Sequence, residues 1–197
     1  MTARDMLLGS ETLYRVILYF ILHPGEAPHF RALQRHVGSG VRPLQAAVAR
    51  LEAQELIRSD GEANRRVLRA DEAHPGWDAL RHMVRAFADP ADVLREALSG
   101  VPGIEAAFVF GSAASGEMRP ESDVDVLIVG DEVPRAALGR GTSESSAVLG
   151  REVNVVRYTR DELARRVAQG NAFVRNVLGG PRRWILGDDP SLLGGAA

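Results

Sequence analysis

The chain has 197 residues, of which 45% are hydrophobic and 25% charged, and its formal net charge is −2. This length accommodates two small domains, each with its own hydrophobic core. Cysteine is absent, which excludes disulfides, thiolate zinc sites and cysteine nucleophiles. Lysine is absent as well, so a Walker-type lysine and a Schiff-base lysine are excluded. All five histidines lie between residues 23 and 82, so the second half cannot form a Ser-His-Asp triad.

The cellular location is predicted from two further features. No apolar run reaches the length of a membrane span, and the start of the chain, with the charged Arg4 and Asp5, shows no apolar core of a signal peptide. We therefore expect a soluble, cytoplasmic protein that does not bind membranes.

The first half shows the element order of a winged helix-turn-helix. Three helices are expected, and Gly38-Ser39-Gly40 separates the second from the third, which opens at Arg42-Pro43. Two short strands on either side of a turn follow. The expected ranges are helices at 11–22, 29–37 and from about 42, strands at 56–58 and 65–69, and a turn at 60–64.

The second half alternates apolar strands with helices, which predicts an α/β or α+β domain. Strands are expected at 104–110, 124–129, 152–158 and 183–186, and helices at 93–98, 134–149, 161–168 and 172–178. The predicted domains are a winged helix-turn-helix at 1–72, a connecting helix within 73–90, an α+β domain at 91–190 with a small mixed sheet flanked by helices, and a tail at 191–197.

Residues 31 to 69 carry eight arginines and four acidic residues, a local net charge of +4, which favours a surface that faces DNA phosphates. In a winged helix the third helix enters the major groove. Arg42 and Gln45 near its start are the candidates for base contacts, because Arg reads guanine and Gln reads adenine. The candidates for contacts further along the helix and from the wing are Arg50, Arg58, Arg65 and Arg66. The alternative is a winged helix used for protein contacts or dimerisation.

The most informative segment combines a glycine-serine turn with paired acids. Phe110-Gly111-Ser112 ends an expected strand, Gly116 follows, and Ser122-Asp123-Val124-Asp125 enters the next strand. Gly111 lets backbone approach a ligand, and Ser112 opens a short helix whose N–H groups can face phosphate. Because Asp123 and Asp125 are two residues apart in a strand, both carboxylates project from one face and can share a divalent cation.

This arrangement resembles the minimal nucleotidyltransferases of the DNA polymerase β superfamily, over roughly residues 91 to 190. With the first half, the chain resembles proteins that fuse a winged helix to such a domain. The resemblance implies that Gly111 and Ser112 contact nucleotide phosphates and that Asp123 and Asp125 bind Mg²⁺ or Mn²⁺. We include Gly116 and Ser122, which complete the motif, among the nucleotide-binding candidates.

One position departs from the pattern of active members, which usually carry a third carboxylate on the strand corresponding to residues 152–156. Asn154 stands where the acid is expected. An amide cannot accept a proton, so loss of a general base would slow catalysis by about 10²- to 10⁴-fold. Glu152 shares a face with Asn154, but residues two apart in a strand are about 7 Å apart, so it is the less favoured substitute.

Three functions follow. The first is a transcription regulator that binds double-stranded DNA, as a homodimer, and a metal–nucleoside triphosphate with weak or absent turnover. The second is an active nucleotidyltransferase that modifies a hydroxyl on a protein, an RNA or a small molecule. For this function the resemblance extends to antitoxins that nucleotidylate a protein toxin partner. The third is a DNA-binding dimer in which the second domain is only a scaffold, which leaves Gly111, Asp123 and Asp125 unexplained.

Overall fold

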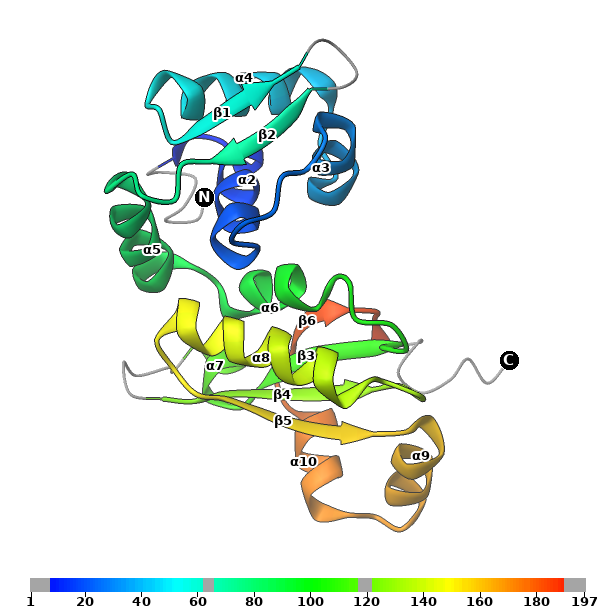
Figure 1. The fold of residues 1–197 in the computed structure, drawn as a ribbon. Helices are drawn as coiled ribbons and strands as arrows, with labels where there is room; N and C mark the ends of the chain where they lie inside the picture. Colours follow the sequence, from blue (N-terminus) through cyan, green and yellow to red (C-terminus); the bar gives the residue numbers. More distant parts are fainter. Residues whose placement is uncertain (1–7, 62–65, 117–121, 190–197) are drawn as a thin grey trace. The chain divides into compact units, whose positions relative to one another are not determined.

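A computed structural model describes residues 8–61, 66–116 and 122–189 of the chain. The structure divides into two compact units, Met1–Ala88 and Asp89–Ala197 (Figure 1).

The first unit contains helices and one hairpin in the order expected from the sequence. Its elements are α2 (Glu11–Leu22), α3 (Phe30–Val37), α4 (Val41–Ala53), β1 (Ile57–Asp60), β2 (Val67–Ala70) and α5 (Gly76–Phe87). The Ser10 side chain caps α2 by accepting a hydrogen bond from the Leu13 N–H. Gly38 ends α3 in the left-handed conformation, with φ 62°, which a residue with a side chain seldom adopts. β1 and β2 pair antiparallel.

The core of the first unit forms around α2, which is buried along nearly its whole length. From α4, the residues Leu44, Val48 and Leu51 are buried, as their helical spacing predicts. α5 joins the same core: the Trp77 ring packs on Phe20, and its indole N–H donates to the carbonyl oxygen of Leu56. The helix expected as a separate connector is therefore an integral part of the first unit, because its large buried indole anchors it there.

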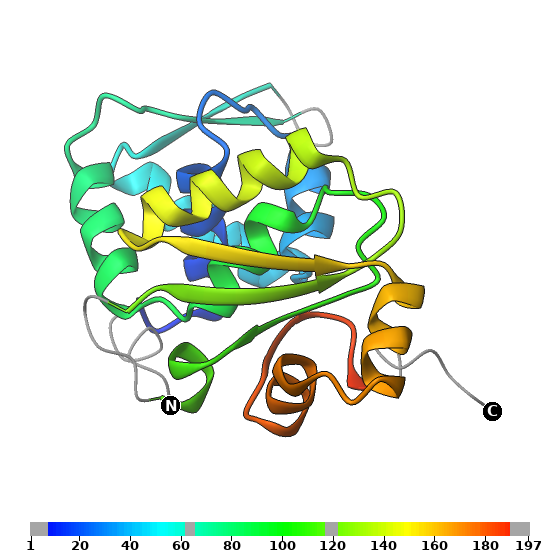
Figure 2. The ribbon, with the colours of Figure 1, turned by 90° about the horizontal axis from the view of Figure 1, so that it is seen from below.

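The second unit is built on a mixed four-stranded sheet. Its elements are α6 (Pro90–Leu98), β3 (Ala106–Phe110), α7 (Ser112–Ser115), β4 (Val124–Val129), α8 (Arg135–Leu149), β5 (Val153–Tyr158), α9 (Arg160–Ala168), α10 (Ala172–Gly179) and β6 (Arg183–Leu186). The strand order is β5-β4-β3-β6, and Figure 2 shows β5, β4 and β3 side by side. β3 runs antiparallel to β4 and β6, whereas β4 and β5 are parallel. The predicted small mixed sheet flanked by helices is confirmed.

Helices cover both faces of this sheet. α6 and α8 lie on one face, and α9 and α10 lie on the other (Figure 1). Alternation along β4 directs Leu127 and Val129 into a core cluster with Leu163 of α9 and with Val174 and Val177 of α10. Asp125 has the same parity as Leu127, so its carboxylate begins the face that α9 and α10 cover. This alternation is what positions the candidate site.

Within the described ranges, no helix is both long enough and apolar enough to cross a membrane.

Candidate functional site

One row of residues crosses three strands at the end of the sheet where β4 and β5 begin. Phe110 on β3 is the register partner of Asp125 on β4, and Asp125 is in turn the partner of Asn154 on β5. Residues directly opposite one another point to the same face of a sheet. The sheet therefore brings Phe110, Asp125 and Asn154 together although they are far apart in the sequence.

Asp123 completes this cluster from the residue before β4. The amide nitrogen of Asn154 donates a hydrogen bond to Asp123 Oδ2, at 3.3 Å. Asp123 is exposed, whereas Asp125 and Asn154 are half-buried. The three predicted catalytic side chains thus converge on one place, with two carboxylates beside one amide.

The surroundings of Asp125 raise its pKa. Burial raises the pKa of Asp125, the charge of Asp123 raises it further, and a hydrogen bond from Asn154 offsets part of the effect. Two like charges held together favour a proton or a divalent cation between them. Carboxylates whose pKa is raised by burial and by a like charge are common at functional sites.

Gly111 lies against the acids at the end of β3. Its backbone has φ 70° and ψ −150°, a region that is essentially restricted to glycine. A Cβ atom at this position would lie 3.1 Å from Asp125 Oδ2. The backbone conformation therefore requires glycine, and a Cβ atom would also crowd the Asp125 carboxylate.

The remaining predicted nucleotide-binding residues flank this point. Ser112 begins α7, a helix of only four residues, and Gly116 ends it with φ 80°. Both Gly111 and Gly116 are exposed, and Ser112 is half-buried. Ser122, also half-buried, directly precedes Asp123. Residues 117–121, between Gly116 and Ser122, lie outside the described part of the chain.

The donor set suits a small, hard cation. Carboxylate oxygens and an amide carbonyl oxygen are ligands that Mg²⁺ and Mn²⁺ accept. The Asn154 amide presents its NH₂ to Asp123, and rotation about its last torsion would present its oxygen instead. The side chain of Asn154 can therefore bind a cation but cannot accept a proton.

The backbone of Glu152 lies beside the start of β4. Val124 pairs with Val153, so the next step of this register places Glu152 opposite Asp123. The Val124 N–H donates to the carbonyl oxygen of Glu152, at 2.8 Å, which fixes this backbone. The Glu152 side chain is exposed.

In the first unit, the start of α4 presents an exposed surface. Arg42, Gln45 and Arg50 are exposed, as expected, and Arg50 donates to the carbonyl oxygen of Leu8. Val41, in the same first turn, is 49% exposed and was not among the predicted contact residues. Its signal in the sequence was a β-branched apolar residue directly after Gly40, outside the buried spacing of the helix.

The predicted wing arginines have partners within the first unit. Arg66 forms an ion pair with Glu52 at 2.7 Å, and both side chains are 29% exposed. Arg58 pairs with Asp71 at 2.9 Å but keeps a 72% exposed side chain. Arg66 was expected to face phosphate, but this ion pair gives it a competing role, the attachment of β2 to α4. Arg65 lies outside the described residues.

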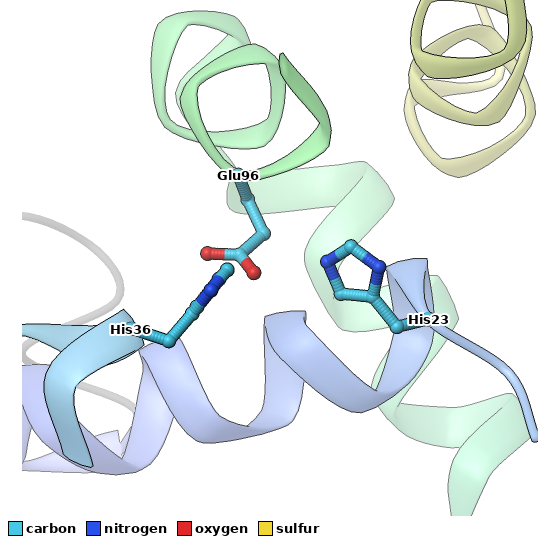
Figure 3. Close-up of side chains that lie close together, drawn as sticks. All are labelled: His23, His36 and Glu96. Carbon is cyan, nitrogen blue, oxygen red and sulfur yellow. The ribbon is translucent and has the colours of Figure 1, made fainter. Parts of the chain in front are cut away.

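Two histidines of the first unit lie face to edge at the corner between α2 and α3 (Figure 3). The ring centroids of His23 and His36 are 5.8 Å apart, and each ring also contacts Tyr19. The Tyr19 hydroxyl donates to Glu26 Oε2, at 2.6 Å. The histidines thus belong to an aromatic cluster that joins two helices.

Comparison with known proteins identifies the second unit. Residues 93–175 match the family model described as Polymerase beta, Nucleotidyltransferase, and this range contains the whole cluster of Gly111, Asp123, Asp125 and Asn154. The second unit therefore contains a nucleotidyltransferase-fold domain. No curated protein matches the sequence significantly.

Solved structures with similar folds include two toxin–antitoxin complexes. One, a toxin–antitoxin with AMP-PNP, is 15% identical over 52% of this chain and 77% of its own, with a TM-score of 0.37. The other, a mutant of the toxin–antitoxin MntA-HpeT, is 13% identical over 52% and 76%, with a TM-score of 0.35. A candidate nucleotidyltransferase from Sulfolobus solfataricus is 19% identical over 49% and 85%, with a TM-score of 0.27.

Proposed function

We propose that the second unit binds a nucleoside triphosphate with Mg²⁺ or Mn²⁺, and that the first unit binds double-stranded DNA, so that the chain acts as a nucleotide-responsive regulator. The observation that carries this proposal is the convergence of Asp123, Asp125 and Asn154 beside Gly111, within the residues that match the nucleotidyltransferase family.

The acids and the glycine have complementary parts in this site. Asp123 and Asp125 would hold the cation, with Asn154 as a neutral oxygen ligand. Burial and the charge of Asp123 together raise the pKa of Asp125, and a bound cation would neutralise phosphate charge and this repulsion between the acids. Gly111 leaves room for phosphate to approach the backbone, and the Ser112 hydroxyl and N–H lie directly after it.

Binding with weak or absent turnover follows from Asn154. Nucleotidyl transfer needs a group that removes the proton from the attacking hydroxyl, and a neutral amide cannot do so. An amide does support cation binding, since it adds a donor oxygen without a third negative charge. We therefore propose a site that recognises nucleotide state in preference to consuming the nucleotide.

The DNA-binding part of the proposal is supported by the exposed first turn of α4. Val41 offers an apolar contact for a thymine methyl. Arg42 offers two donors for guanine, and Gln45 offers an amide for adenine. Arg50 and the 72% exposed Arg58 would contact backbone phosphates. Since winged helices commonly bind two half-sites, we extend the proposal to a homodimer.

The nucleotide site is tested by calorimetric titration of the full chain with ATP, GTP, CTP and UTP, with and without Mg²⁺, while pyrophosphate release is followed. We expect Mg²⁺-dependent binding without release. The Asp123→Asn/Asp125→Asn variant should lose binding, and Asp131→Asn, an exposed acid beyond the other end of β4, should retain it. Unchanged affinity in the double variant would refute the site.

The DNA surface is tested by titrating duplexes selected from a random pool. Arg42→Ala together with Gln45→Ala should weaken the selected complex by at least about tenfold, because each good base contact contributes about 1–3 kcal/mol of discrimination. The control is Arg81→Ala, which removes an arginine paired with Asp78 on α5. Equal retardation by all three proteins would rule out α4 as the reading helix.

An active nucleotidyltransferase is the second candidate, and the register that places Glu152 opposite Asp123 favours it. In this case Glu152 would accept the proton that Asn154 cannot. The resemblance noted in the sequence implies a protein toxin, an RNA or a small molecule as acceptor. Release of pyrophosphate by the wild type, lost in Glu152→Gln but not in Glu105→Gln, would establish this function in place of sensing.

A further inference from the structure

An aromatic pair lies next to the acids and has no part in the function proposed so far. Phe110 on β3 and Phe173 on α10 pack edge to face, with ring centroids 5.9 Å apart and an interplanar angle of 80°. We propose that Phe173 is the stacking surface for the nucleobase, so that the site binds nucleotides in preference to inorganic polyphosphate. This inference rests on the proposed nucleotide site.

Phe110 connects the pair to the metal-binding acids. It is the register partner of Asp125, and directly opposite residues have Cβ atoms about 5 Å apart on the same face. The Phe173 ring is one aromatic contact further away. The exposed ring is therefore within the reach of a nucleotide whose phosphates lie at Asp125, because phosphates and base are separated by the length of a ribose.

The local structure holds Phe173 outside the core. α10 buries Val174 and Val177, and Phe173 lies at the edge of this buried face, one helical turn before Val177. The helix start is fixed by Asn171, whose side chain accepts a hydrogen bond from the Val174 N–H at 3.1 Å. Phe173 is 40% exposed, so part of a large apolar ring faces solvent in a fixed orientation. An aromatic ring held in this way binds a flat partner at low cost in side-chain entropy.

Stacking on a phenyl ring is available to every base, because every base has a π-face. The surface therefore distinguishes a nucleotide from a polyphosphate but does not choose among bases. We expect ATP and GTP to depend on Phe173 to a similar degree. Tripolyphosphate, which has the charge of the phosphate chain and no base, should not depend on Phe173.

The test compares Mg²⁺-dependent binding of ATP and of inorganic tripolyphosphate by the full chain. Phe173→Ala should weaken ATP binding by about 5- to 150-fold, the range for loss of one base–aromatic stack, and leave tripolyphosphate binding unchanged. Phe173→Tyr, which retains the ring, should restore ATP binding. Val167→Ala is the matched control, since Val167 is an exposed apolar residue on the neighbouring α9.

The outcomes separate this inference from the proposed function. If the wild type binds ATP and Phe173→Ala binds it equally well, or loses ATP and tripolyphosphate in parallel, the stacking role is wrong and the nucleotide site stands. If the wild type binds neither ligand, the nucleotide site itself is refuted, and the stacking role with it. Thermal melting of Phe173→Ala confirms that the comparison is made on folded protein.

Discussion

Asn154 determines how much negative charge the candidate site carries. It faces Asp125 across the β4–β5 pair and donates to Asp123, so in the absence of a cation its amide relieves the repulsion between the two acids. A carboxylate in its place would add a third charge to the same space. Without metal, the site therefore has less electrostatic repulsion than three carboxylates would give, but it lacks the group that would accept a proton.

Replacing Asn154 with Asp tests this balance. We expect Asn154→Asp to lower the melting temperature in the absence of metal, because three carboxylates then repel one another, and to recover stability on addition of Mg²⁺. Pyrophosphate release from an NTP and an acceptor should rise by about 10²- to 10⁴-fold, the usual contribution of a general base. The isosteric charge variant Asn171→Asp, at the start of α10, serves as the control. Faster release with an unchanged metal-free melting temperature would contradict the electrostatic account.

Asp125 gives a pH-dependent prediction. Burial and the Asp123 charge raise its pKa, so its ionised form costs stability above the folded-state pKa, and this cost disappears as the pH falls through that pKa. Asp125→Asn should therefore stabilise the metal-free protein at neutral pH, by less than about 1 kcal/mol because the site is partly solvated. The difference should vanish in acid. Melting curves at several pH values measure this difference in stability. If Asp125→Asn is less stable than the wild type at neutral pH, the predicted direction of the effect is wrong.

Among the structural elements, the first unit depends on a contact between the hairpin and α4. Arg66 donates to both carboxylate oxygens of Glu52, at 2.7 Å each, and to the Ser59 hydroxyl at 2.7 Å. Burial raises the pKa of Glu52, but the hydrogen bonds from Arg66 and Ser59 and the Arg66 charge outweigh it and lower the pKa. This half-buried pair holds β1 and β2 against the helix proposed to read DNA.

We predict that Arg66→Ala destabilises the protein by about 1–2 kcal/mol, since it leaves a partly buried carboxylate without its partner. Because the pKa of Glu52 is lowered, the pair stabilises the protein above the unfolded-state pKa and this stability is lost as the pH falls. The free energy of unfolding of the variant should therefore be lower than that of the wild type at neutral pH, and the two values should become equal in acid. Urea titrations at several pH values provide the measurement, with Arg58→Ala as the surface-pair control; equal, small losses for both variants would contradict the distinction.

The elements that the sequence predicted correctly are those with strong periodicity or a tightly spaced motif. The strands at 124–129 and 183–186 and the helix at 11–22 have the bounds expected, since apolar residues dominate each segment. The role of Arg66 was not predictable, because its partner Glu52 lies on another element and charge alone does not reveal pairing. Phe173 was missed for a related reason: only the β3–α10 packing brings it next to Phe110.

In the candidate site, too, the features that are local in the sequence were predictable and those that depend on strand pairing were not. The Gly-Ser turn and the Asp-x-Asp spacing predicted which residues bear the chemistry, because their order along the chain is local. Asn154 was predicted from the family resemblance, whereas the register that places it beside Asp125, and Glu152 opposite Asp123, depends on how parallel β4 and β5 align. A shift of one residue would turn Asn154 to the other face, and nothing in either strand by itself determines that alignment.

At the scale of the whole molecule, a regulator requires that nucleotide binding and DNA binding affect each other. If Mg²⁺–nucleotide changes the DNA affinity by some factor, DNA must change the nucleotide affinity by the same factor. We expect each affinity to change by about 5- to 150-fold, the usual range of such coupling. Fluorescence anisotropy of a selected duplex with and without Mg²⁺–ATP measures the DNA affinity. Calorimetry of ATP with and without that duplex measures the nucleotide affinity. In Asp123→Asn/Asp125→Asn the shift should disappear while the DNA affinity of the nucleotide-free protein is retained, because the substitutions lie outside the proposed DNA surface. The wild type and the double variant, each with and without Mg²⁺–ATP, could instead have equal DNA affinities. The two units would then bind their ligands independently, and the regulatory part of the proposal would be wrong even if both binding sites are correct.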